Sequence, residues 1–322
     1  MIDEYQELRV NGSAQWVYLR GQSKGAILLF VHGGPGSPLV PIARGFEGPF
    51  LKDYLVIHWD QRGVGKSFQS TDFSQGFSLD QFVADGLSVA RQIQSRYPDR
   101  PIILVGHSWG TVIGIRMAAA APELFTAYIS IGTNSHSMAA ENYRYEVLEA
   151  AMLKESDSRE LAELHRIGRP PWVSKRWEDW GTFAGKHIPH EQSWGQISVE
   201  KIEGSIRLCL AAGDYSEKEL EDIFAEGLSQ SFDHLADDYY SFSAIEQVPR
   251  LRIPIFFLQG SLDFNTPSHI AKRYFEALEA PSGKYWIEKE GCAHMIFYEN
   301  PDAFLEVCRS IDHAENDTDP SP

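Results

Sequence analysis

The stretch Ile102-Ile103-Leu104-Val105-Gly106-His107-Ser108-Trp109-Gly110-Thr111-Val112-Ile113-Gly114 decides the fold of this 322-residue chain. An apolar run enters Gly-x-Ser-x-Gly and helix-compatible sequence follows at once, which predicts a strand, a tight turn and a helix. Glycines two residues before and two after Ser108 let the strand and the helix approach without a side-chain clash. Gly-x-Ser-x-Gly also occurs by chance in loops, but the strand and helix around it favour a turn that exposes Ser108 as a nucleophile.

Composition and charge exclude several classes of partner. The formal net charge of -16 at pH 7 disfavours nucleic acid and anionic membranes, because binding to a polyanion needs a basic patch. The apolar runs are strand-length and too short to cross a bilayer. The acidic start lacks the basic and apolar regions of a secretory signal, so we expect a cytoplasmic location. Three scattered cysteines predict free thiols and neither a disulfide framework nor a metal site.

Strand and helix patterns alternate along both ends of the chain. Two alternating runs within residues 5–20 flank Asn11-Gly12, which predicts an antiparallel hairpin at a sheet edge. Continuously apolar runs at 26–31 and 54–59 are typical of strands covered on both faces by helices. We predict an α/β fold, with a mostly parallel eight-stranded sheet and helices on both faces. Further strands are expected at 102–105, 127–131, 253–258 and 284–288, and helices at 79–97, 267–278 and 301–311.

The alternation stops between about residues 133 and 249, where only amphipathic segments occur. We therefore expect a core in two parts, 1–132 and 250–311, with a helical cap inserted at 133–249. The short acidic tail at 312–322 is expected to be disordered. Two roles remain open for the tryptophans of the cap, which either line a pocket or pack its helices onto the core. They are Trp172, Trp177, Trp180 and Trp194.

Two glycine-containing loops resemble nucleotide-binding motifs only in part. Residues 63–67 end like a phosphate loop, but the leading glycine of that motif falls at Asp60, whose carboxylate would repel phosphate. The loop at 33–36 lacks the third glycine of a dinucleotide fingerprint. We expect no cofactor.

Three side chains with complementary chemistry each follow a predicted strand. In a parallel α/β sheet, sites form at the carboxyl ends of the strands, and Ser108, Asp263 and His294 all fall there. His294 would take the serine proton and deliver it to the leaving group, while Asp263 would fix the imidazole tautomer. The position after the preceding strand, 132–134, holds no carboxylate, which favours Asp263.

Two backbone donors are expected to stabilise the oxyanion. One is the N–H of Trp109, directly after the nucleophile, and the other comes from the Gly-rich loop at 32–36. Gly34 is the candidate in that loop, because Pro35 has no N–H and glycine allows close approach.

Three motifs together resemble the proline iminopeptidase family of α/β-hydrolases. They are His32-Gly33-Gly34-Pro35-Gly36, Asp60-Gln61-Arg62-Gly63-x-Gly65-x-Ser67 and Gly106-His107-Ser108-Trp109-Gly110. With the Asp263 and His294 loops, the resemblance covers the core at both ends. It implies cofactor-free hydrolysis, in which typical members release an N-terminal residue, often proline, from short peptides. It also implies cap carboxylates that hold the free amine of the substrate.

The cap resembles the family less than the core does. Trp177-Glu178-Asp179-Trp180 is similar to a Trp-x-x-Trp-Glu element, with Gly181 where the glutamate would stand. The resemblance implies Glu203 as the first candidate for the amine partner and Glu178 as the second, and Trp180 as a further substrate-binding residue. An alternative function therefore stays open, namely hydrolysis of another small amide or ester by the same core.

A non-catalytic receptor or scaffold on the same fold is a different class of protein, because fold alone does not determine function. Such proteins often lose one member of the triad, whereas all three members occur in this sequence. Haloalkane dehalogenases and epoxide hydrolases need a carboxylate where Ser108 stands, so they are excluded. We predict a serine hydrolase that acts through an acyl-enzyme on a small-molecule or short-peptide substrate.

Overall fold

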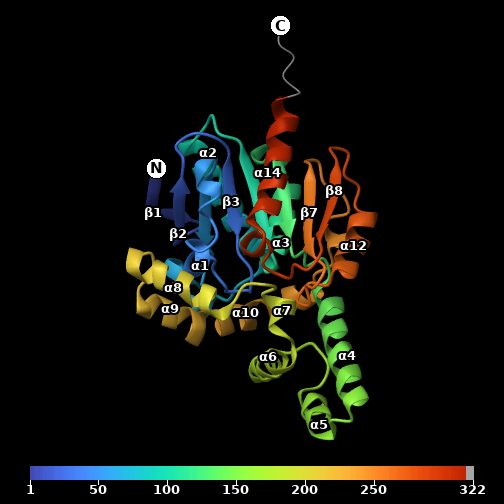
Figure 1. The fold of residues 1–322 in the computed structure, drawn as a ribbon. Helices are drawn as coiled ribbons and strands as arrows, with labels where there is room; N and C mark the ends of the chain where they lie inside the picture. The colour runs from blue at the N-terminus through green and yellow to red at the C-terminus, as the bar shows by residue number, and fades with distance from the viewer. Residues whose placement is uncertain (317–322) are drawn as a thin grey trace.

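The computed structural model describes residues 1–316 and contains one eight-stranded sheet (Figure 1). The strand order is β1-β2-β4-β3-β5-β6-β7-β8. β1 and β4 each pair with β2 in antiparallel register, and all other pairs are parallel. The predicted mostly parallel sheet is therefore confirmed. The strands are β1 (Ile2–Val10), β2 (Ser13–Gly21), β3 (Ile27–Val31), β4 (Leu55–Asp60), β5 (Ile102–His107), β6 (Ala127–Ile131), β7 (Ile255–Gly260) and β8 (Lys284–Lys289).

The first hairpin turns at Asn11-Gly12, as its sequence predicts. Asn11 has φ 44° and Gly12 has φ 86°, and both values belong to the left-handed region that asparagine and glycine tolerate best. Val10 pairs with Ser13 directly across this two-residue turn. The hairpin forms one edge of the sheet, where antiparallel pairing is possible without a crossover helix.

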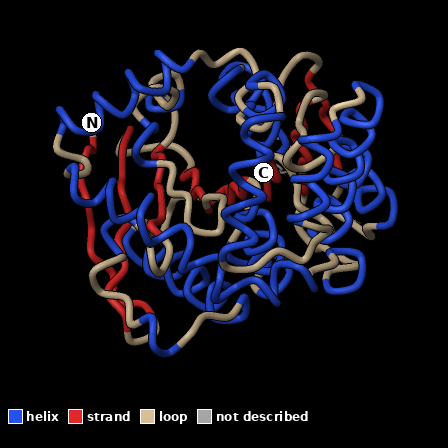
Figure 2. The backbone as a smooth tube through the Cα atoms, turned by 90° about the horizontal axis from the view of Figure 1, so that it is seen from below, coloured by secondary structure: helices blue, strands red, loops and turns tan. Residues whose placement is uncertain are grey.

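Helices cover both faces of the parallel strands. Along β3, Ile27, Leu29 and Val31 pack into one core with α2 (Leu79–Arg96), α3 (Trp109–Ala120) and α12 (Ser268–Ala277). The alternate residues Leu28 and Phe30 pack into the opposite core with α1 (Val40–Ala43) and α14 (Pro301–Asn316). This period of two explains the continuously apolar strands. In Figure 2, helices lie on either side of the strands.

The closing helix is longer than the sequence suggested. We expected it to end near residue 311 and a disordered tail to follow, but α14 continues to Asn316. Residues 312–316 contain neither proline nor glycine, so nothing in them ends a helix. The Tyr54 hydroxyl also donates to Asp312 at 2.6 Å. Residues 317–322 lie outside the described part of the chain.

The segment between β6 and β7 contains helices only, and we call it the cap. Figure 1 shows α8, α9 and α10 below the sheet, and α4, α5 and α6 projecting further down. The projecting part has a small apolar core of its own that includes Trp172 and Trp180. The helices are α4 (Ser137–Glu155), α5 (Ser158–Ile167), α6 (Lys175–His187), α7 (His190–Ser193), α8 (Val199–Ala212), α9 (Glu217–Asp222), the π-helix η5 (Ile223–Gly227), α10 (Leu228–Ser241) and α11 (Ala244–Gln247).

Short helices complete the core. They are the 3-10 turns η1 (Phe50–Lys52), η2 (Gly65–Ser67), η3 (Phe73–Gln75) and η4 (Pro122–Leu124), and the single α-helical turn α13 (Ile296–Glu299). The three cysteines are buried and free. Within residues 1–316, no helix is long and apolar enough to span a membrane.

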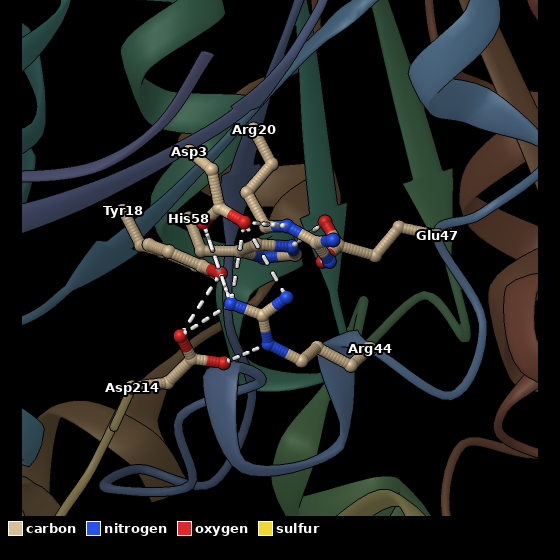
Figure 3. Close-up of polar contacts among 7 residues, drawn as sticks. All are labelled: Asp3, Tyr18, Arg20, Arg44, Glu47, His58 and Asp214. Carbon is tan, nitrogen blue, oxygen red and sulfur yellow. Dashed lines mark hydrogen bonds and ion pairs between the residues drawn. The ribbon is translucent and has the colours of Figure 1, made fainter. Parts of the chain in front are cut away.

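A network of ion pairs and hydrogen bonds connects the cap to the core beside α1 (Figure 3). Arg44, which follows α1, contacts Asp214, which follows α8, through Nε and through Nη2 at 2.7 Å from Oδ1. The Tyr18 hydroxyl donates to the same carboxylate at 3.1 Å. Arg20 pairs with Glu47 at 2.6 Å in the same network. Because α1 packs directly on α8, these contacts hold one wall of the cap in place.

Candidate active site

Ser108 occupies the turn between β5 and α3 with φ 54° and ψ −122°, a conformation that non-glycine residues rarely adopt. The two glycines of the motif make this turn possible. A Cβ atom on Gly106 would lie 2.6 Å from the Tyr128 hydroxyl oxygen, and one on Gly110 would lie 1.9 Å from the carbonyl oxygen of Val31. Neither position therefore accepts a side chain, and Ser108 is held at the sharp bend that the sequence predicts.

His294 and Asp263 form a buried pair in the loops after β8 and β7. Nδ1 of His294 lies 2.8 Å from Oδ2 of Asp263. The same carboxylate accepts the hydroxyl of Thr266 at 2.7 Å, and its Oδ1 accepts the N–H groups of Asn265 at 2.9 Å and Thr266 at 3.0 Å. Nδ1 therefore carries the proton, and Nε2 keeps the lone pair that a general base needs.

The electrostatics of this pair keep the carboxylate ionised. Burial opposes ionisation of Asp263, but its electrostatic interaction and hydrogen bond with His294 outweigh that effect, with help from Thr266, and lower the pKa of Asp263. Gly132, directly after β6, lets the pair pack closely. A Cβ atom there would lie 3.0 Å from the His294 ring and 3.2 Å from Oδ2 of Asp263.

His107, at the end of β5, contacts the loop that carries His294. Its Nε2 lies 3.0 Å from the carbonyl oxygen of His294. A carbonyl only accepts, so Nε2 carries a proton. Burial lowers the pKa of His107 to about 3, and the neighbouring His294 acts in the same direction. Sequence analysis gave His107 no role, although its position inside the nucleophile motif was a usable signal.

The Gly-rich loop after β3 lies directly beside the serine. A Cβ atom on Gly33 would lie 3.0 Å from Cβ of Ser108. Gly34 has φ 109°, and a Cβ atom there would lie 2.5 Å from the backbone nitrogen of Gly36. Trp109 begins α3, and the first N–H groups of a helix have no intrahelical partner. Gly33 therefore lies beside Ser108, Gly34 follows it in the same loop, and Trp109 directly follows the serine. That the N–H groups of Gly34 and Trp109 bind an oxyanion stays a prediction.

The second motif of the sequence supports this loop. Nε2 of His32 accepts the N–H of Gln61 at 3.3 Å, and the Gln61 amide donates to the carbonyl oxygen of His32 at 3.0 Å. The protonated Nδ1 of His32 faces the Gly33 carbonyl oxygen at 2.9 Å. Burial lowers the pKa of His32 to about 4, so the ring is neutral. Gln61 therefore positions the loop that carries Gly34.

The other residues of that motif bind the core and the cap. Arg62 pairs with Asp85 on α2 at 2.8 Å. Asp60 accepts the Tyr215 hydroxyl of the cap at 2.6 Å and the N–H of Lys66 at 2.9 Å. Burial raises the pKa of Asp60 to about 6 despite these hydrogen bonds. The sequence predicted no role for these side chains, and in the structure they stabilise the loop at 32–36, α2 and the cap.

A cavity of about 580 Å³ lies between the core and the cap, and Ser108, His294 and Gly34 all line it. Most of its wall is apolar, and the contributing side chains include Ile42, Ile202, Ile206, Leu228, Phe232 and Met295. Trp177 and Trp194 also line it. A pocket of this size with a few convergent polar groups is typical of small-ligand sites. Across residues 1–316, no cluster of three or more His, Cys, Asp or Glu side chains suited to a metal ion was found.

The structure does not bring the three predicted cap residues to this cavity. The face of α8 that lines the cavity carries Ile202 and Ile206. Glu203 lies outside this face and is exposed, with its Oε2 3.5 Å from Nη1 of Arg207. Glu178 is exposed on α6 beside Lys175.

Trp180 is the third of these cap residues, and it is buried in the core of the cap. It stacks on Trp172 with ring centroids 4.0 Å apart. The four cap tryptophans therefore have two different roles. Trp172 and Trp180 pack in the apolar core of the cap, whereas Trp177 and Trp194 line the cavity.

Glu141 on α4 is a carboxylate of the cavity wall that sequence analysis missed. It is only 6% exposed. The Tyr239 hydroxyl donates to its Oε1 at 2.8 Å, and Nη1 of Arg144 lies 2.8 Å from its Oε2. Arg144 lines the same cavity and lies over the Trp180 and Phe264 rings. A Glu and an Arg three residues apart are common on exposed helices, so the sequence alone carried little signal.

Comparison with known proteins agrees with this architecture. A family model described as alpha/beta hydrolase fold matches residues 26–163. A Bacillus subtilis protein named probable aminopeptidase YbaC is 29% identical over 94% of this chain and 93% of its own length. A proline iminopeptidase of Lactobacillus crispatus is 24% identical over 88% of each chain. The solved proline iminopeptidase of Mycobacterium smegmatis has a TM-score of 0.65 at 17% identity, covering 98% of this chain and 100% of that one.

The sheet order and these matches show that the chain has the α/β-hydrolase fold. Within that class it is similar to proline iminopeptidases, so the resemblance inferred from the sequence motifs is confirmed. An epoxide hydrolase of Vigna radiata also shares the fold, with a TM-score of 0.62 at 18% identity over 97% of this chain and 98% of that one. The fold is thus common to several chemistries, and the residues of the site must distinguish them.

Proposed function

We propose that this protein is a serine hydrolase that cleaves a small amide or peptide bond through an acyl-enzyme, as an aminopeptidase of short peptides. The observation that carries the proposal is the buried Asp263–His294 pair in a cavity that also exposes Ser108 on its strained turn. Hydrolysis by this route needs no cofactor, since the chain itself supplies nucleophile, base and oxyanion donors.

The reaction follows from these positions. Nε2 of His294 takes the hydroxyl proton as Oγ of Ser108 attacks the scissile carbonyl, and the carbonyl oxygen becomes an oxyanion held by the N–H groups of Gly34 and Trp109. The C–N bond then breaks, and His294 gives its proton to the leaving amine. A water molecule, deprotonated by His294, attacks the carbonyl carbon of the serine ester. The ester C–O bond breaks, His294 returns the proton to Oγ of Ser108, and the acid is released. Asp263 stays ionised and stabilises the imidazolium throughout.

The aminopeptidase specificity rests on Glu141 in place of Glu203 and Glu178. A substrate ammonium that leaves water needs a carboxylate partner, because an unpaired buried charge is very costly. Glu141 is the acidic side chain among the described residues of the cavity wall. Its bonds to Tyr239 and Arg144 hold the carboxylate in place, and each oxygen retains a second lone pair for an ammonium N–H.

The Arg144–Glu141 pair also supports a second candidate. Because Arg144 already balances the charge of Glu141, the cavity can accept an uncharged substrate at no electrostatic cost. A small-molecule ester or amide hydrolase therefore remains the alternative. A non-catalytic receptor ranks below both enzymes, because the complete triad would serve no purpose in it. A cytoplasmic location, with no nucleic-acid or membrane partner, stays a prediction from the sequence.

A matched substrate panel tests the proposal. Aminoacyl 4-nitroanilides with a free amine are compared with their N-acetylated forms and with simple 4-nitrophenyl esters. The aminopeptidase proposal predicts faster hydrolysis of the free-amine forms, with proline and other apolar residues included among the acyl groups. Equal rates on free and acetylated substrates would remove the aminopeptidase specificity and leave the ester or amide hydrolase.

A further inference from the structure

A carboxylate behind the active site joins the catalytic loop to the cap. Glu299 ends α13, five residues after His294. Its two carboxylate oxygens lie 2.9 and 3.1 Å from the backbone nitrogen of Ala293, the residue directly before His294. The backbone N–H groups of Gln196 and Met295 also lie close enough to this carboxylate to favour its charged form. Glu299 therefore collects donors from both sides of His294 and from the cap loop between α7 and α8.

The cap loop is shaped to receive this carboxylate. Gly195 has φ 59°, and a Cβ atom there would lie 1.5 Å from Oε2 of Glu299. A side chain at position 195 would thus occupy the place of the carboxylate. The neighbouring Trp194 lines the cavity on the cap side, and Met295 lines it on the side of the core. A displacement of Glu299 would consequently move both walls and the segment that carries the base.

In the part of the chain that the structure describes, backbone N–H groups, and not a charged side chain, hold the Glu299 carboxylate. In the described residues, Glu299 forms no ion pair with lysine, arginine or histidine. Burial raises the pKa of Glu299, whereas the three backbone N–H groups oppose that shift. An arrangement of two acceptor oxygens facing several N–H groups fixes a geometry, because each N–H loses a charge-assisted bond if the carboxylate moves.

We infer that Glu299 is a positioning residue that sets the place of His294 and of the cap loop together. This inference rests on the proposed serine hydrolase function. The carboxylate does not touch the reacting atoms. It acts through the backbone of Ala293 and Met295, in the way that outer groups orient the residues that perform the chemistry. His107 holds the carbonyl of His294 from the opposite side, so the base is fixed by its ring, its carbonyl and its neighbouring N–H groups.

The test compares Glu299→Gln with two matched variants. Glutamine keeps the shape but replaces one acceptor oxygen by an NH2 group that faces backbone N–H donors. We expect kcat to fall about tenfold to a hundredfold, as small misplacements of catalytic groups do. The rate of fluorophosphonate labelling of Ser108 should fall by a similar factor. Gly195→Ala should lower both rates from the cap side, and the double variant should cost little more than either single one.

Glu306→Gln is the control, because Glu306 is an exposed carboxylate on α14 whose ion pair is with Lys289 at 3.4 Å, away from His294. It should leave kcat and labelling unchanged. Hydrogen exchange of the Ala293 and Gln196 amides should accelerate in Glu299→Gln and not in the control. If Glu299→Gln does not fold, Gly195→Ala alone carries the test.

Two outcomes would overturn the inference. In the first, Glu299→Gln lowers the melting temperature but keeps kcat, KM and the labelling rate of the unaltered protein, which would make Glu299 merely structural. In the second, the effects of Glu299→Gln and Gly195→Ala on kcat are additive. Failure of the unaltered protein to label at Ser108 would instead contradict the proposed function, so the two failures are distinguishable.

Discussion

Nδ1 of His294 lies 2.8 Å from Oδ2 of Asp263, and both oxygens of that carboxylate accept further hydrogen bonds from residues 265 and 266. The carboxylate therefore has one orientation and fixes one imidazole tautomer. Asp263→Asn should leave the fold intact and lower kcat by about 10⁴, because the amide stabilises the wrong tautomer. Steady-state kinetics and the melting temperature check this prediction. Near-normal turnover would mean that another carboxylate orients His294.

Glu141→Gln tests the proposed partner of the substrate amine. It should weaken hydrolysis of free-amine substrates by about 1.5–3 kcal/mol in kcat/KM, the usual value of a hydrogen bond to a charged group. N-acetylated substrates and simple esters should be nearly unaffected. Glu203→Gln is the matched control, because Glu203 is an exposed cap carboxylate outside the cavity. An equal loss on blocked and free substrates would contradict amine binding by Glu141.

Asp60→Asn tests the buried carboxylate that accepts the Tyr215 hydroxyl. Burial raises the pKa of Asp60 to about 6, so the folded state favours its neutral form. Asp60 contributes fully to the free energy of unfolding below the pKa that it has in the unfolded chain. This contribution is lost as pH rises through about 6, the pKa in the folded protein. The stability of Asp60→Asn relative to the unaltered protein should therefore increase between about pH 4 and pH 6, by about 3 kcal/mol in total. Urea unfolding across this pH range measures the difference, and a constant difference would contradict the prediction.

Asp214→Ala tests the network that anchors α8 to α1 (Figure 3). The Arg44 and Asp214 side chains are 18% and 4% exposed. The free energy of unfolding should fall by an amount between the roughly 1 kcal/mol of an exposed ion pair and the roughly 3–5 kcal/mol of a broken buried pair. Asp3→Ala is the milder control, because Asp3 lies at the exposed end of the network, with its side chain 42% exposed. Equal stability of the Asp214→Ala and unaltered proteins would mean that the pair contributes nothing to anchoring the cap.

The positions of Ser108, Asp263 and His294 could be predicted because local sequence determines them. Ser108 depends on a turn with glycines at fixed offsets, and Asp263 and His294 directly follow their strands. Strand order and direction then bring the three loops to one edge of the sheet, as general rules for parallel α/β sheets require. The Asn11-Gly12 hairpin could be predicted for the same reason, since two adjacent residues suffice for the turn.

The cap residues could not be predicted, because their roles depend on how the helices pack in three dimensions. Glu203 and Ile202 are sequence neighbours on α8, yet only Ile202 lines the cavity. Glu141 becomes a wall residue because Tyr239, 98 positions away, lies against it. Glu299 likewise acquires its partners through the approach of Gly195. No local pattern encodes these contacts, whereas charged residues on helices are ordinarily exposed.

The labelling of Ser108 tests the central claim most directly. The protein is treated with a fluorophosphonate, and the adduct is located by mass spectrometry of the intact chain and of its peptides. The account predicts one adduct per chain at Ser108, no adduct in Ser108→Ala and a greatly slowed reaction in His294→Ala, because the hydroxyl is a weak nucleophile without its base. Absence of an adduct in the unaltered folded protein, or an adduct at another residue that persists in Ser108→Ala, would contradict it.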